Sequence, residues 1–128
     1  MIELSRHANK IETETGMGGE FIMSALLDKA FDFCIRSIEL VNYLEEEKRP
    51  FPLANRLLEC AEETCVCLRM SHYVPRSASE YGTQALKLTL EAECLLELMV
   101  KTGILSDMQS APILTECRFL KNELKSDF

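Results

Sequence analysis

The sequence predicts an all-α protein, an antiparallel up-down-up-down four-helix bundle with a flexible or partly helical N-terminal extension. The main observation is a run of apolar residues spaced four, three, four, three and four apart, which only a helix places on one stripe. These residues are Tyr81, Ala85, Leu88, Ala92, Leu95 and Met99. In addition, 128 residues include only five Gly and four Pro, too few for a sandwich or barrel of many tight turns.

The chain has the length of one domain with a real hydrophobic core. We expect residues 1–22 to form an extension or linker, because Gly16, Gly18 and Gly19 favour flexibility there. Residues 23–128 are expected to form the bundle.

The first 20 residues contain several charged side chains, which is typical of neither a signal peptide nor a membrane anchor. No apolar run approaches the roughly 20 residues that cross a bilayer. We therefore expect a cytoplasmic protein with no membrane partner.

The first bundle helix is expected to begin at Ser24, a residue type that caps helices, and to run to about Lys48. Its apolar residues form two adjoining stripes, an arc wider than one bundle seam needs. Exposing the large side chains would cost roughly 1.5–3 kcal/mol each, so we expect copies of the chain to associate. One stripe is Leu27, Phe31, Cys34, Ile38 and Val41. The other, expected at the interface, is Leu26, Ala30, Phe33, Leu40 and Leu44.

The second helix is expected from about Leu53 to Ser71, after Pro50 and Pro52. The positions expected to face inward are mostly small and would let two backbones approach closely: Ala54, Leu58, Ala61, Cys65 and Leu68.

The third helix is expected to follow Pro75, with Ser77 or Ser79 as N-cap. It is expected to end at Gly103, since helices commonly end in a residue with the left-handed conformation. Ser106 to Gln109 reads as a capping box that opens the fourth helix. Pro112 is expected to kink or restart that helix, because it removes one backbone hydrogen bond.

The cysteines are interpreted as packed free thiols, because they lie at mostly apolar positions in a chain without an export signal. Cys65 and Cys67 point about 200° apart on a helix and cannot jointly hold one metal. Redox sensing or metal binding by this pair is the alternative. The six cysteines are Cys34, Cys60, Cys65, Cys67, Cys94 and Cys117.

The formal net charge of −7 weakens the case for a surface that binds nucleic acid everywhere. However, residues 64–79 contain no acidic residue and include Arg69, His72 and Arg76. With Arg56 nearby in sequence, these are the candidate residues for binding an anion or a nucleic acid. The alternative is ordinary solvated surface.

No enzymatic activity, cofactor or metal is expected. Di-iron bundles use Glu-x-x-His pairs, but the residues three before His7 and His72 are Leu4 and Arg69. A Cys-His nucleophile near Cys65 or Cys67 lacks an evident activating acid.

Several short segments also occur in a characteristic order from about Ser24 to Leu124. They are residues 28–33 (DKAFDF), Tyr43-Leu44 before the EEEKR run, Leu57-Leu58, Ala85-Leu86-Lys87 with Glu91 and Glu93, and residues 102–105 (TGIL). In this order they resemble the small bacterial four-helix-bundle proteins named after intervening sequences in 23S ribosomal RNA genes. Residues 63–69 depart from the family, because the usual Ala-Asn pair and the Glu are missing.

The resemblance implies a ring-shaped homopentamer without established enzymatic activity. A related branch, the accessory variability determinant proteins of diversity-generating retroelements, binds reverse transcriptase and nucleic acid but tends to be basic, unlike this chain. We therefore expect a non-catalytic, self-assembling scaffold or accessory factor that contacts nucleic acid or a nucleoprotein enzyme. The alternatives are a retroelement accessory protein that binds a reverse transcriptase, or a regulatory bundle that binds a partner without nucleic-acid contact.

Overall fold

The computed structural model describes residues 18–127, with side chains for 25–126, and this part of the chain is built from α-helices without a strand. The all-α prediction is therefore confirmed. Helix α2 begins at Gly18, before the expected Ser24, and residues 1–17 of the expected extension lie outside the described residues. The elements are α2 (Gly18–Glu46), α3 (Ala54–Tyr73), a 3-10 turn η1 (Pro75–Ser77), α4 (Ala78–Lys101) and α5 (Asp107–Asp127).

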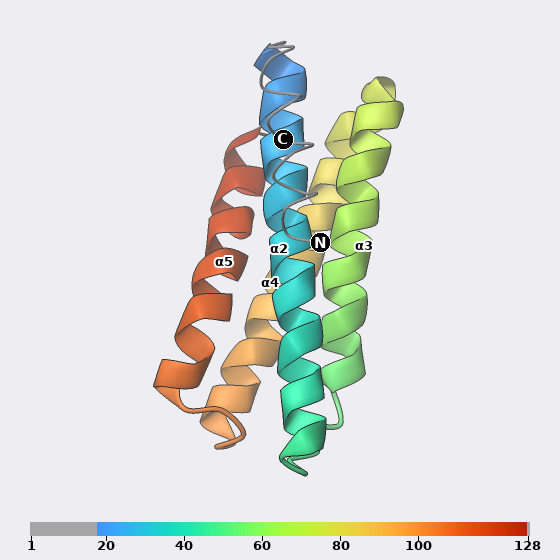
Figure 1. Ribbon diagram of the computed structural model, residues 1–128. Helices are drawn as coiled ribbons and strands as arrows, with labels where there is room; N and C mark the ends of the chain where they lie inside the picture. Colours follow the sequence, from blue (N-terminus) through green and yellow to red (C-terminus); the bar gives the residue numbers. More distant parts are fainter. Residues whose placement is uncertain (1–17, 128) are drawn as a thin grey trace.

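The helices form an antiparallel bundle in which each packs against the next along the chain (Figure 1). Short connections of this kind force neighbouring helices to run in opposite directions. Helix α5 returns beside α2 and closes the bundle. The contact between α3 and α4 is the most extensive, whereas that between α2 and α5 is the least extensive.

The core takes one stripe from each helix. The stripe that predicted the fold on α4 is buried from Ala85 to Met99, and Tyr81 at its start is half-buried. Helix α3 contributes Leu57 and Leu68, both at most 1% exposed, whereas the expected inward residues Ala54 and Leu58 are only half-buried. The other large, fully buried side chains are Phe33, Leu96, Met99, Leu105, Leu120 and Leu124.

The expected oligomer interface on the first helix needs correction. Leu26, Ala30, Phe33 and Leu44 are at most 4% exposed within a single chain, and only Leu40 is half-buried. The physical reason is that α2 packs against both α3 and α5, so two neighbours fill the wide apolar arc. Four of the five residues therefore offer no accessible apolar surface while the bundle is folded.

The helix ends largely follow the predicted local signals. Gly103 has φ 79°, and the Ile104 N–H donates to the Met99 carbonyl at 2.9 Å, which closes a Schellman motif. Ser106 and Gln109 exchange the two capping-box hydrogen bonds at 2.9 and 3.1 Å. Ser77 occupies the N-cap of α4, but its side chain makes no capping hydrogen bond.

Pro112 lies inside α5, which continues from Asp107 to Asp127 without restarting. Of the two expected effects, a kink or a restart, the restart was wrong. Pro112 lies close to the beginning of α5, so the one backbone hydrogen bond that it removes belongs to the first turns of the helix, and the helix continues beyond them.

Replacing Lys48 with glycine is expected to raise the free energy of unfolding by about 0.5–1 kcal/mol. Lys48 has φ 54°, and the Arg49 N–H donates to the Leu44 carbonyl at 2.9 Å in a second Schellman motif at the end of α2. A side chain is strained in this left-handed conformation, and glycine is not. Urea denaturation measures the gain. Lys48→Ala serves as the control, and an equal gain in that variant would contradict the explanation.

Candidate functional site

The structure divides the four basic candidate residues into two groups. Arg69 and His72 lie in the last turns of α3, and Arg76 lies in η1 directly after it. Arg56 lies in the first turn of α3, roughly 20 Å away from Arg69 along the helix axis at about 1.5 Å per residue. A single site therefore holds three of the four.

Arg56 is held by carboxylates from two helices. Its Nε and Nη2 donate to the two Glu91 carboxylate oxygens on α4 at 2.5 and 2.8 Å, and Nη1 lies 3.5 Å from Glu59 Oε1 and 3.9 Å from Glu63 Oε1. The hydrogen bonds to Glu91 raise the pKa of Arg56. A phosphate would have to displace these acids and approach through their negative field. In the structure the Arg56 side chain joins α3 to α4.

Arg69, His72 and Arg76 are exposed, and within residues 25–126 none of them forms an ion pair with a carboxylate. The Arg69 guanidinium lies 5.7 Å from the centre of the Phe31 ring. This contact holds the positive charge at the surface between α2 and α3.

Tyr73 was not among the site residues that the sequence analysis selected. It is the last residue of α3, is 72% exposed, and packs edge-on against His72 with ring centres 6.2 Å apart. A signal was present, because an aromatic residue stands among basic residues. We call Arg69, His72, Tyr73 and Arg76 the basic–aromatic end.

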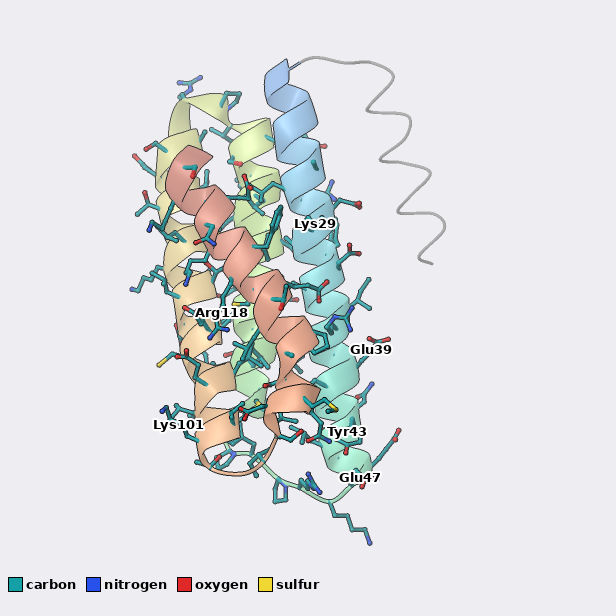
Figure 2. All side chains as sticks on the ribbon, turned by 90° about the vertical axis from the view of Figure 1, so that its left-hand side faces the viewer. Lys29, Glu39, Tyr43, Glu47, Lys101 and Arg118 are labelled. Atoms are coloured by element: carbon teal, nitrogen blue, oxygen red, sulfur yellow. The ribbon has the colours of Figure 1, made fainter. Side chains whose placement is uncertain are left out.

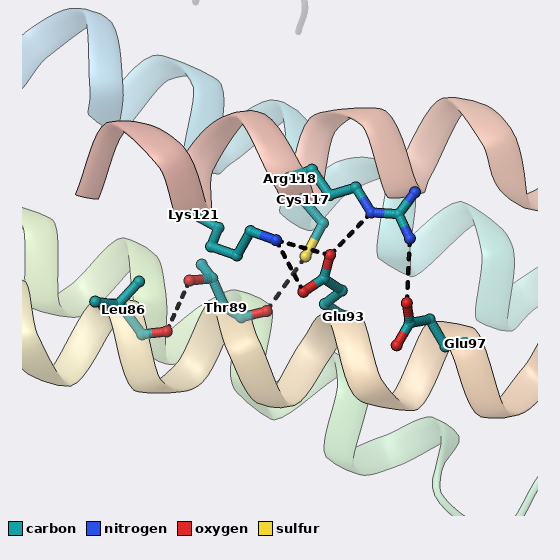
Figure 3. Close-up of polar contacts among 7 residues, drawn as sticks. All are labelled: Leu86, Thr89, Glu93, Glu97, Cys117, Arg118 and Lys121. Carbon is teal, nitrogen blue, oxygen red and sulfur yellow. Dashed lines mark hydrogen bonds and ion pairs between the residues drawn. The ribbon is translucent and has the colours of Figure 1, made fainter. Parts of the chain in front are cut away.

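An ion-pair cluster between α4 and α5 was also missed. Glu93 accepts hydrogen bonds from Arg118 Nε at 2.8 Å and from Lys121 Nζ at 3.0 and 3.2 Å, and Arg118 also reaches Glu97 at 3.2 Å (Figure 3). The available signal was the spacing of the charges. The acids Glu93 and Glu97 lie four residues apart on one helix, and the bases Arg118 and Lys121 lie three apart on the next. All their charges are mutually satisfied, so the cluster is a contact between helices.

Most of the cysteines behave as the sequence predicted, since all six are free and four are buried. Burial, more than the nearby Glu91 charge, raises the pKa of Cys60 to about 11, and burial raises the pKa of Cys117 to about 12. Such thiols are protonated and unreactive. Cys94 is exposed on α4, contrary to the packed interpretation. Within the described residues, no three or more His, Cys, Asp or Glu side chains cluster in a way that could hold a metal ion.

The fold and the site together define a small antiparallel four-helix bundle with a basic–aromatic end. No model of a known protein family matches the chain, and no curated protein matches it in sequence. Among the described residues, no helix is long and apolar enough to cross a membrane.

A solved structure with the same fold is that of a protein of unknown function from the S23 ribosomal protein family of Bacteroides thetaiotaomicron. The TM-score is 0.76 and the sequence identity is 22%, over 82% of this chain and 96% of that one. At this identity the likeness shows the fold.

Proposed function

We propose that this chain is a non-catalytic bundle that contacts single-stranded nucleic acid through its basic–aromatic end. The supporting observation is that Arg69, His72 and Arg76 are exposed beside the exposed ring of Tyr73, in a chain of net charge −7, and pair with no carboxylate of residues 25–126. Guanidinium groups bind phosphates, and aromatic rings stack on unpaired bases. This combination suits a strand whose bases are accessible.

The acidic balance of the chain shapes the expected binding. Two arginines neutralise about two phosphates, which gives a shallow salt dependence for a single strand, with a slope of about −1.4. The remaining acidic surface repels the rest of the strand. We therefore expect weak binding that is confined to the basic–aromatic end, unlike binding by an extended basic surface.

The test is fluorescence anisotropy with a labelled single-stranded RNA at about 50 mM salt, where electrostatic binding is strong. We expect Tyr73→Ala, which removes one stacking ring, to weaken binding at least about fivefold. The paired change Arg69→Gln with Arg76→Gln should weaken it further and flatten the salt dependence. Lys101→Gln is the matched control, because Lys101 lies at the opposite end of the bundle, where α4 ends (Figure 2).

Two outcomes of this assay would overturn the proposal. The first is that the wild-type chain binds no RNA or DNA even at low salt. The second is that Lys101→Gln weakens binding as much as the changes at the basic–aromatic end. A reverse transcriptase as the partner is implied by the family resemblance alone.

We further propose that the chain self-assembles through the side where α2 meets α5. That contact is the least extensive in the bundle. Leu40, half-buried, lines a cavity of about 320 Å³ there with Tyr43, Pro112 and Ile113. Gln109 donates to the Tyr43 hydroxyl at 3.0 Å and holds the rim in place. The pentameric state is implied by the resemblance.

Light scattering after size exclusion tests the assembly at micromolar concentration. We expect an oligomer for the wild-type chain and a folded, smaller species for Leu40→Asp, since the new charge would be buried at the contact. A wild-type monomer would exclude self-assembly. An unchanged oligomer in Leu40→Asp would show that the contact lies on another face of the bundle.

A further inference from the structure

The basic–aromatic end contains one side chain of a type that changes its charge near neutral pH, His72. An arginine keeps its positive charge at all physiological pH values, and a tyrosine hydroxyl carries no charge there. Among the side-chain types present, only histidine ordinarily gains or loses a proton between about pH 5 and pH 8. The charge of the basic–aromatic end therefore depends on pH through His72.

The geometry places this proton among the groups that would hold a strand. His72 is exposed and follows Arg69 by three residues, so both lie on the same side of α3. Its ring is edge-on to the exposed ring of Tyr73, with ring centres 6.2 Å apart. Arg76 follows on η1. A proton on His72 thus adds a third positive charge beside two arginines and a stacking ring.

The surroundings of His72 leave that charge available to a ligand. Helices α2 and α4 and the turn η1 pack against α3 or continue from it. The charged residues that they carry towards this end of α3 are Asp28, Lys29 and Asp32 around Phe31 on α2, Arg76 on η1, and Glu80 in the first turn of α4. Within residues 25–126 no carboxylate forms an ion pair with His72. A phosphate bound beside the imidazole would favour its protonated form, so proton and strand would bind cooperatively.

We propose that protonation of His72 strengthens the binding of single-stranded nucleic acid at the basic–aromatic end, so that the site binds more tightly as the pH falls. This inference rests on the proposed function of that end. Each phosphate contact with a single strand contributes about −0.7 to the slope of log K against log salt, so the slope should steepen from about −1.4 to about −2.1. At about 50 mM salt one such contact corresponds to roughly fivefold to tenfold tighter binding.

The test is fluorescence anisotropy at about 50 mM salt, at about pH 8 and at about pH 5.5. The probe is an oligouridylate of about ten nucleotides without a terminal phosphate, labelled with a dye that does not respond to pH. Neither its bases nor its phosphodiesters titrate in this range, so a change in affinity reports on the protein. We expect the wild-type chain to bind roughly fivefold to tenfold more tightly at the lower pH.

Three variants assign the effect. His72→Gln should bind as weakly at the lower pH as wild type does at the higher pH. His72→Arg should bind tightly at both, because its charge is permanent. His7→Gln is the matched control: it removes the second histidine of the chain, which lies outside the described residues, and should leave the pH effect unchanged. Any pH effect that remains in His72→Gln comes from other groups of this acidic chain and is subtracted.

Calorimetry gives an independent readout of the proton. Titrations near pH 7 in two buffers of different protonation enthalpy should show that binding takes up a fraction of a proton in wild type and none in His72→Gln. If wild type binds RNA but His72→Gln keeps the full pH effect, or His7→Gln abolishes it, this inference is overturned and the proposed function stands. Absence of binding at both pH values would overturn the two together.

Discussion

Replacing Phe33 with alanine is expected to lower the free energy of unfolding by about 3–5 kcal/mol, the largest effect among the predictions made for this chain. The Phe33 side chain is 0% exposed and lies in the core of a single chain. Its removal leaves a cavity that close-packed neighbours cannot fill. Because domains of this size are stable by about 5–15 kcal/mol, this loss is a large share of the total stability. Urea denaturation followed by circular dichroism measures the loss.

The same experiment decides where Phe33 acts. Ile38, on the other apolar stripe of α2, is 46% exposed, so Ile38→Ala should cost less than about 1 kcal/mol and is the matched control. If Phe33 lay between copies of the chain instead, Phe33→Ala would give a folded, smaller species of nearly unchanged stability. That result would contradict the burial of Phe33 within one bundle.

Replacing Glu93 with glutamine is expected to cost about 2 kcal/mol, the second largest effect. The Glu93 side chain is only 14% exposed and accepts three charged hydrogen bonds from Arg118 and Lys121 (Figure 3). The expected cost is no larger because the Arg118 side chain is 46% exposed and water solvates it when its partner is lost. Thermal and urea unfolding measure it.

Glu97→Gln is the control for Glu93→Gln on the same helix. Glu97 is 46% exposed and makes a single contact with Arg118 at 3.2 Å. An exposed pair of this kind contributes at most about 0.5 kcal/mol. Equal losses in the two variants would show that the partial burial of Glu93 is unimportant.

The pH dependence of the Glu93 effect follows from its pKa. Burial raises the pKa of this carboxyl, but the hydrogen bonds from Arg118 and Lys121 together outweigh burial, so the pKa lies below 4.5. A lowered pKa in the folded state contributes stability at higher pH, and that stability is lost as the pH falls through the folded-state value. The difference between wild type and Glu93→Gln should therefore narrow below about pH 4.5. A constant difference would contradict the ion-pair explanation.

The candidate site could be predicted only in part. Arg69, His72 and Arg76 were found because they stand in a stretch without acids, and the turn after α3 keeps neighbours in sequence close in space. Arg56 was included because it is close in sequence, yet its partner Glu91 is 35 residues away on α4. A pairing across helices of this kind cannot be read from spacing along one helix.

The sequence by itself determined the class of fold and the local helix ends. The apolar period on α4, the left-handed Gly103 and the capping box at Ser106 depend on hydrogen bonds and side chains within a few residues of each other. Only the tertiary structure decided that the stripe containing Phe33 faces the core of one chain. It also decided that Arg56 pairs with Glu91. Both depend on which helices become neighbours and on how each helix is rotated about its axis. Burial of the whole core determines these neighbours and rotations for all the helices at once.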